Sequence, residues 1–240
     1  MRPTNPLYRD ERQKVEEHFH FGVSVDCIVF GYDGHDLNVL LIERGKEPFK
    51  GQMAIPGDLV NIDESLDDAT QRVLKDLTGV EDVYLEELGA LGAINRHPLG
   101  RVITVAYYAL IYMPDRNPHP SSWATDAKWV SLKDAQDLAF DHDKIVTASI
   151  QALRSSIRNR PIGANLLPEE FTLGQYQAVF ESILGIELDK ANFRKKILAT
   201  NLLKPLDKQQ KAVNHRPARL YAFDQEAYSK LMDQGLDFQL

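Results

Sequence analysis

The stretch 54–80, AIPGDLVNIDESLDDATQRVLKDLTGV, decides the fold of this chain. Its second half predicts an amphipathic helix over Ser65–Thr78, because apolar residues recur there at three- and four-residue intervals. Ser65 stands at the expected N-cap, and Gly79 stands where helices commonly end in a left-handed residue. The helix is preceded by Pro56-Gly57, which predicts a turn.

The spacing within this stretch resembles the Nudix hydrolase motif, in which a glycine, a glutamate, an Arg-Glu pair, a Glu-Glu pair and a closing glycine fall at fixed intervals. The pattern is matched by Glu64, Arg72 and Gly79. The other positions depart from it, with Asp58 for the first glycine, Val73 for the glutamate after the arginine, and Asp76-Leu77 for the Glu-Glu pair. The resemblance implies a Nudix-like α/β/α sandwich that has lost most of its catalytic carboxylates.

The lost carboxylates bear directly on catalysis. Nudix hydrolases cleave diphosphates with Mg²⁺, which needs oxygen ligands in near-octahedral geometry. Positions 73, 76 and 77 share one helix face, yet only Asp76 is acidic there. We therefore expect no enzyme activity, no catalytic residue, no bound metal and no cofactor.

Composition is that of a globular protein of 240 residues, with 43% hydrophobic residues and a net charge of −7. The one cysteine, Cys27, lies in an apolar run and is expected in the core, so no disulfide within the chain is possible. No apolar stretch approaches the ~20 residues of a membrane span, and the N-terminus is polar. We expect a cytoplasmic protein without membrane contact.

The pattern of strands and turns places a ligand-binding domain at 21–158, after an N-terminal arm at 1–20. Strands are predicted at 23–30 and 37–44 around an Asp33-Gly34 turn, then at 84–94, 102–113 and 128–130. A second helix is predicted over 144–158. This order of elements fits the α+β arrangement that the motif implies.

The C-terminal part, 161–240, predicts a winged helix-turn-helix domain. Thr172 opens one helix that ends at Gly185, and Asp189 caps a second, basic helix that runs to about Thr200. A basic segment then leads to Arg219-Leu220-Tyr221-Ala222-Phe223, which alternates like a strand of the wing. Arg160-Pro161-Ile162-Gly163 is read as the linker between the domains.

Charge is unevenly distributed along the chain. Residues 189–219 hold nine Lys and Arg but only two acids, so this segment carries +7 and the rest carries −14. Such a segment favours double-stranded DNA as a partner. The candidate DNA-binding residues are Asn192, Arg194, Lys195, Lys196, Lys208, Lys211, Arg216 and Arg219.

Both halves together resemble the Nudix-related transcriptional regulators. The resemblance runs from about Phe21 to Phe223 and includes the segments 95–101, 138–142 and 163–168. That group includes regulators of NAD metabolism that sense ADP-ribose and Bacteroidetes regulators of sugar use that sense L-arabinose. The residues of the motif are more similar to those of the arabinose-responsive branch, and so is the segment Gly163-Ala164-Asn165-Leu166-Leu167-Pro168.

The resemblance implies a DNA-binding regulator, expected as a homodimer on paired half-sites, with a small-molecule effector in the Nudix-like half. The candidate effector-binding residues are Arg44, Asp58, Glu64, Arg96 and Arg101. Asp58 adds a negative charge where a phosphate would approach, which favours neutral L-arabinose over ADP-ribose. Asp141 and His142 are either effector contacts or a helix cap beside a hydrogen-bonded histidine. ADP-ribose sensing and an active hydrolase remain the alternatives.

Overall fold

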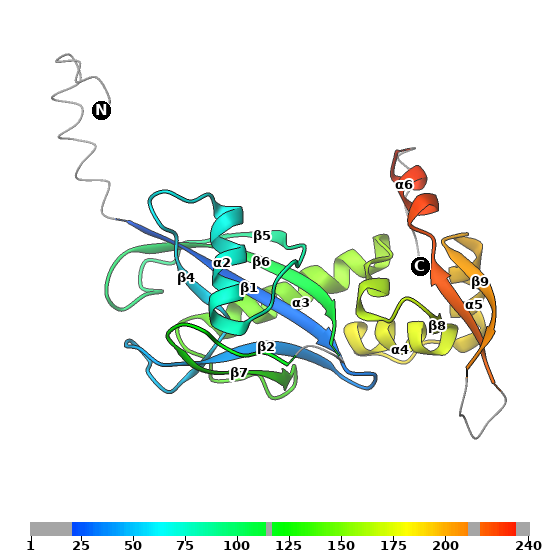
Figure 1. Ribbon diagram of the computed structural model, residues 1–240, viewed down its shortest axis with the longest axis horizontal. Helices are drawn as coiled ribbons and strands as arrows, with labels where there is room; N and C mark the ends of the chain where they lie inside the picture. The colour runs from blue at the N-terminus through cyan, green and yellow to red at the C-terminus, as the bar shows by residue number, and fades with distance from the viewer. Residues whose placement is uncertain (1–20, 114–116, 211–216, 234–240) are drawn as a thin grey trace, which may run out of the picture.

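The computed structural model describes residues 21–113, 117–210 and 217–233 (Figure 1). The expected arm at 1–20 lies outside these residues. Throughout the described ranges, no helix combines the length and the apolar character that crossing a membrane requires.

The N-terminal half is built on a seven-stranded mixed sheet. Its central pair is parallel, with β1 (Gly22–Tyr32) beside β6 (Val102–Tyr112) over their whole lengths. The order is β3-β2-β1-β6-β5, with β4 paired to β1 and β7 paired to β2. The remaining strands are β2 (Leu37–Arg44), β3 (Met53–Ala54), β4 (Gly57–Leu59), β5 (Glu86–Leu91) and β7 (Ala124–Ser131).

Helices cover both faces of this sheet, and β1 supplies side chains to each. Val25 and Cys27 lie in a buried cluster with α2 (Leu66–Thr78), whereas Ile28 and Phe30 pack in a second cluster with α3 (His142–Asn159). This alternation follows from the two-residue period of a strand. The expected α/β/α sandwich and the core position of Cys27 are confirmed.

The helix of the motif forms as its local signals predict. The Ser65 hydroxyl accepts from the Asp68 backbone N–H at 3.1 Å, and the Asp68 carboxylate accepts from Ser65 in return. Gly79 ends the helix at φ +71°. The turn predicted at Pro56-Gly57 is wrong in one respect, since Gly57 already begins β4 and lies opposite Asp26 of β1.

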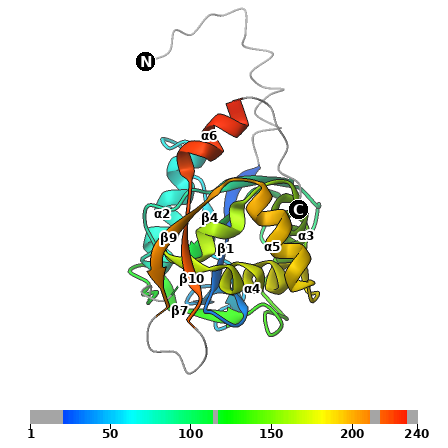
Figure 2. The same ribbon diagram turned by 90° about the vertical axis from the view of Figure 1, so that its right-hand side faces the viewer.

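The C-terminal half forms a winged helix, as predicted (Figure 2). Helices α4 (Leu173–Leu184) and α5 (Lys190–Ala199) are capped by Thr172 and Asp189, and Gly185 ends α4 at φ +70°. Strands β9 (Leu203–Gln209) and β10 (Arg219–Phe223) form the hairpin, and β8 (Phe171–Thr172) completes a three-stranded sheet. Helix α6 (Gln225–Asp233), which the sequence analysis did not anticipate, follows the hairpin.

A single apolar cluster joins the two halves. It runs from Phe30 on β1 through Leu153 on α3 to Phe180 and Phe193 of the winged helix. The end of the segment read as the linker, Arg160–Gly163, forms part of a packed 3-10 helix, η2 (Ile162–Leu166). A Cβ on Gly163 would lie 3.3 Å from side-chain atoms on α3 and α4, so a larger residue there would require these neighbours to shift by a few tenths of an ångström.

Candidate effector pocket and DNA-binding surface

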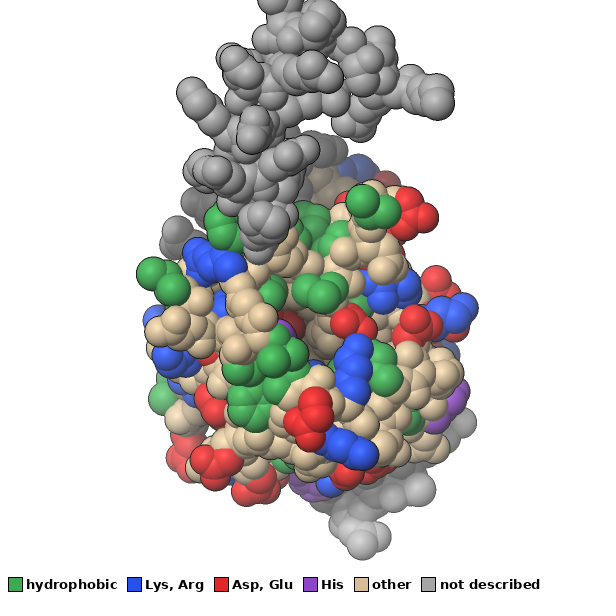
Figure 3. Space-filling view, turned by 90° about the vertical axis from the view of Figure 1, so that its left-hand side faces the viewer, with side chains coloured by type: hydrophobic (Ala, Val, Ile, Leu, Met, Phe, Trp, Pro, Cys, Tyr) green, Lys and Arg blue, Asp and Glu red, His purple; other side chains and the backbone are tan. Residues whose placement is uncertain are grey.

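A cavity of about 300 Å³ opens at the end of the sheet where β1 begins and β2 ends. Figure 3 looks at the molecule from this side and shows a hollow bordered by hydrophobic, acidic and basic side chains. The lining comes from β1, β2, β4, the 95–102 segment and the start of α3. Its charged members are Asp26, Arg44, Lys46, Glu47, Asp58 and Arg96.

Three of the five predicted effector residues, Arg44, Asp58 and Arg96, line this cavity together. The other two have structural partners elsewhere. Arg101 donates to the backbone carbonyls of Gly92 and Ala93, at 2.7 and 2.9 Å. Glu64 is paired with Arg72 at the start of α2.

Arg96 is buried and bridges two carboxylates. Its Nη2 lies 3.1 Å from Asp26 Oδ2 and 2.8 Å from Asp141 Oδ1, and its Nε lies 3.2 Å from Asp141 Oδ2. The pair with Asp141 is therefore bidentate, the geometry in which arginine binds a carboxylate most specifically. Asp26 and Asp141 share the Nη2 of one guanidinium, which joins β1 to the start of α3.

His142 is held in one orientation below the cavity. Its Nδ1 accepts from the Ile55 backbone N–H at 3.1 Å, and its Nε2 faces Asp26 Oδ1 at 3.6 Å. Burial lowers the pKa of His142, which favours the neutral ring with its proton on Nε2. The expectation of a hydrogen-bonded histidine is confirmed, whereas its neighbour Asp141 occupies the N-cap position with its carboxylate turned to Arg96.

Aromatic rings surround Arg44 beside the cavity, and of these rings Phe140 and His97 line it. The Arg44 guanidinium lies 5.0 Å from the Trp123 ring centre and 4.8 Å from that of Phe140, and its Nε donates to the Pro48 carbonyl at 2.7 Å. The His97 ring stacks on Phe140 with 5.1 Å between ring centres. These rings fix the Arg44 side chain beside the cavity and offer flat apolar surface to a ligand.

The Asp58 carboxylate interacts with Trp123 and with Lys46. Its carboxylate accepts from Trp123 Nε1 at 2.7 Å and lies 3.3 Å from Lys46 Nζ. Lys46 also lies 4.1 Å from the Trp123 ring centre. The negative charge that the sequence suggested at this position is thus offset by an adjacent cation.

The motif carries no arrangement suited to Mg²⁺ along the described chain. Val73 and Leu77 are both buried in the apolar cluster under α2, so these positions contribute packing and no ligand oxygen. The Glu64 carboxylate accepts from Arg72 Nε at 2.8 Å. Within the described ranges, no three His, Cys, Asp or Glu side chains gather as a metal site would require.

Four of the predicted DNA-binding residues share the exposed side of α5. Asn192, Arg194, Lys195 and Lys196 are exposed, while Phe193 and Ile197 between them are buried. The helix therefore presents a basic, polar face beside the hairpin, as a recognition helix does.

The described cations of the hairpin, Lys208 and Arg219, both lie against acidic side chains. Lys208 forms an ion pair with Glu170, and Arg219 donates to the Leu206 carbonyl at 3.0 Å and lies 3.4 Å from Asp207. Both of them stabilise the hairpin region in addition to carrying charge. Lys211 and Arg216 lie outside the described residues.

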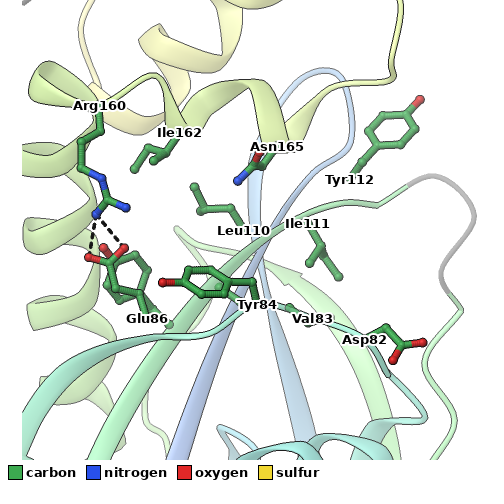
Figure 4. A pocket seen from close by; sticks show the side chains of 12 residues that line it. Asp82, Val83, Tyr84, Glu86, Leu110, Ile111, Tyr112, Arg160, Ile162 and Asn165 are labelled. Carbon is green, nitrogen blue, oxygen red and sulfur yellow. Dashed lines mark hydrogen bonds and ion pairs between the residues drawn. The ribbon is translucent and has the colours of Figure 1, made fainter. Parts of the chain in front are cut away.

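A second cavity, of about 460 Å³, lies where the sheet meets the segment after α3 (Figure 4). Arg160 reaches across to Glu86 on β5, with Nη1 at 2.7 Å from both carboxylate oxygens. Tyr84, Ile162 and Asn165 line the same space. The ion pair anchors the start of the DNA-binding half to the edge of the sheet.

Among the lining residues of the first cavity, sequence reasoning missed Asp26, Lys46 and Phe140, and it also missed Trp123, which contacts Asp58 beside the cavity. Asp26 is a charged residue inside an otherwise apolar strand, which is a signal that the sequence does contain. Trp123 belongs to no motif and reaches Asp58 across 65 residues of sequence. Only the folded sheet brings that pair together.

Family models match both halves of the chain in order. The NUDIX domain model matches residues 20–148, and the NrtR DNA-binding winged helix domain model matches residues 163–223. A relative from Acinetobacter baylyi, the ADPR responsive transcriptional repressor NtrR, is 33% identical over 220 residues, which is 90% of this chain and 87% of that protein.

Two solved structures of NrtR are similar to this chain and support the same family. Shewanella oneidensis NrtR complexed with a 27mer DNA is 30% identical, with a TM-score of 0.76 over 86% of this chain and 95% of that one. The NUDIX domain of the same NrtR complexed with ADP ribose is 29% identical, with a TM-score of 0.55 over 62% of this chain and 99% of that one. Sequence and structure together show that this chain belongs to the NrtR family of transcriptional regulators, in which a Nudix domain precedes a DNA-binding winged helix.

Proposed function

We propose that this protein is a transcriptional regulator whose DNA binding is controlled by ADP-ribose bound in the Nudix half. The observation that carries the proposal is the cavity that holds Arg44, Lys46 and Arg96 beside aromatic rings. Arginine suits the oxygens of a diphosphate, and aromatic faces suit an adenine ring. A relative described as ADPR responsive supports the same effector.

The comparisons support ADP-ribose and give no support to L-arabinose, which the sequence analysis favoured. That preference rested on the similarity of two sequence segments to the arabinose-responsive branch and on the negative charge of Asp58. In the structure Lys46 and Trp123 engage this carboxylate, so its repulsion of a phosphate is reduced. Three cations and three acids line the cavity, so its charge count by itself favours neither ligand, and the choice of ADP-ribose rests on the relatives described with it.

In the proposal, the winged helix binds an operator through α5. Asn192 and Arg194 are placed to contact base edges, and Lys195 and Lys196 to contact phosphates. The hairpin with Lys208 and Arg219, and with Lys211 and Arg216 beyond the described residues, adds backbone contacts. A homodimer on paired half-sites, with domains at 21–158 and 161–240, completes the proposal.

We further propose that the Nudix half is a sensor without hydrolase activity. Glutamates at positions 73 and 77 would be needed to complete the motif, yet both positions are buried in apolar surroundings. Introducing carboxylates there would cost stability before it could create a metal site. Chromatography of the reaction mixture tests this proposal. If the unaltered protein releases AMP from ADP-ribose, a purely sensory role is contradicted.

Calorimetric titration of the full chain tests the effector. Saturable heat with ADP-ribose and none with L-arabinose is the expected result, and the reverse would return the protein to sugar sensing. Arg44→Gln is expected to weaken ADP-ribose binding strongly. Arg101→Gln is the matched control, because Arg101 donates to backbone carbonyls outside the cavity and its loss leaves the affinity nearly unchanged.

A further inference from the structure

Asp141 stands at the N-cap of α3 but does not cap it. Aspartate is among the preferred N-cap residues because its carboxylate accepts from the backbone N–H groups of the first turn. Here, although α3 lies wholly within the described chain, no such side-chain hydrogen bond forms. The carboxylate instead makes its bidentate pair with Arg96.

Arg96 is the residue through which a ligand would reach Asp141. Its side chain is only 4% exposed, yet it lines the cavity. A phosphate oxygen in the cavity would compete with Asp141 for the same guanidinium, since arginine binds phosphate and carboxylate with the same planar geometry. The ion pair between Arg96 and Asp26 keeps the arginine attached to β1 during such a change.

Helix α3 carries any change at Asp141 to the DNA-binding half. It starts at His142 beside the cavity, and Leu153 and Ile157 near its other end lie in the cluster that contains Phe180 and Phe193. Arg154 Nε also donates to the carbonyl of Ile183 on α4 at 2.8 Å. A closely packed helix moves as a unit, so a displacement of its first turn also displaces the residues that contact α4.

We propose that the Asp141 carboxylate is a two-position switch: it binds Arg96 when the cavity is empty and caps α3 when an anionic effector takes Arg96. The switch rests on the proposed function, because it needs a diphosphate ligand in this cavity. The Asp141 backbone, now at φ −108° and ψ 23°, would have to turn to the extended conformation of a capping residue, so the two positions of the carboxylate are discrete arrangements. The ligand then alters DNA affinity by favouring one arrangement, and DNA must alter ligand affinity by the same factor.

The test separates capping from pairing by two substitutions at one position. Asparagine remains a good N-cap but pairs weakly with Arg96, whereas alanine does neither. Operator duplexes selected from random DNA by the full-length protein serve as the probe, with affinity measured by fluorescence anisotropy. Asp141→Asn without ligand is expected to show the operator affinity that the unaltered protein shows with saturating ADP-ribose, within about threefold, against a coupling typically of about 5- to 150-fold.

Asp141→Ala is expected not to reproduce that state, and Asp36→Asn is the matched control. Asp36 pairs with Lys133 at 2.9 Å on the surface, away from α3, so its loss should leave the coupling unchanged. If Asp141→Asn behaves like Asp36→Asn and keeps full coupling, the switch is wrong while the sensor function stands. If the unaltered protein binds no ADP-ribose in the calorimeter, the proposed function fails and the switch fails with it.

Hydrogen exchange gives a second measurement that does not depend on how any variant folds. Capping by Asp141 would protect the amide of Asp143, the second residue of α3, whereas the Lys144 amide already donates to the Asp141 carbonyl at 3.0 Å. ADP-ribose is therefore expected to slow exchange at the Asp143 amide in the unaltered full-length protein. Unchanged exchange in this turn at saturating ADP-ribose would overturn the proposal.

Discussion

The indole N–H of Trp123 donates to the carboxylate of Asp58 over 2.7 Å, and Lys46 lies against both of them. This contact places a tryptophan from the segment before β7 on a residue of β4. It holds Asp58 in a fixed position at the rim of the cavity and keeps its charge beside an ammonium group.

Asp58→Asn is expected to tighten ADP-ribose binding by about two- to fivefold, measured by calorimetry. Asparagine still offers an oxygen to Trp123, while the loss of one charge leaves Lys46 to a phosphate, and a partly exposed charge pair is worth about 0.5–1 kcal/mol. Glu43→Gln, a change of the same kind outside the cavity, serves as the control. Weaker binding in Asp58→Asn would mean that the carboxylate itself contacts the ligand.

Two glycine-to-alanine substitutions should change stability in opposite directions. A Cβ on Gly57 would lie 2.0 Å from Asp26 Oδ1, so Gly57→Ala is expected to lower the free energy of unfolding by about 1–3 kcal/mol and to weaken effector binding. A Cβ on Gly174, in the first turn of α4, would lie 3.7 Å from Thr172 Oγ1, which is ordinary van der Waals contact. Gly174→Ala should therefore raise stability by about 0.4–1 kcal/mol in urea unfolding. Equal effects at both sites would contradict the packing described at Gly57.

The pair of Glu64 with Arg72 predicts a pH dependence of stability. Hydrogen bonds from Arg72 and from the Asn61 backbone lower the pKa of Glu64 from 4.5 to about 2. A lowered carboxyl pKa stabilises the folded state above pH 4.5, and this contribution is lost as pH falls from there towards 2. Glu64→Gln should thus lower the Tm at pH 7, and the difference from the unaltered protein should shrink below pH 4.5. A difference that stays constant down to pH 2.5 would show that the charge plays no part.

Substitutions on α5 should reveal phosphate contacts by their salt dependence. Lys195→Ala is expected to weaken operator binding and to reduce the slope of log affinity against log salt by about 1. Lys133→Ala removes an exposed lysine from the Nudix half and should leave both quantities unchanged. An unaltered slope in Lys195→Ala would place this face of α5 away from the DNA backbone.

The two domain folds and helices α2, α4 and α5 were predictable because their signals are local, whereas α6 was not predicted. Ser65 with Asp68, Thr172 with Gln175, and Gly79 and Gly185 each act within a few residues of chain, so their positions in sequence fix helix ends. The cavity was anticipated only in part. Of the residues predicted to bind the effector, Arg44, Asp58 and Arg96 line it, whereas Glu64 and Arg101 do not.

The sequence by itself determined the order of a Nudix-like sandwich and a winged helix, the loss of the motif's carboxylates and the basic face of α5. The tertiary structure decided which other residues the functional side chains contact. Whether Asp58 repels a phosphate depends on Lys46 and Trp123, and whether Asp141 caps its helix depends on Arg96, which is 45 residues away in sequence. Such contacts follow from strand register and helix packing, which bring distant residues together, and side-chain charges act on whatever lies nearest in space.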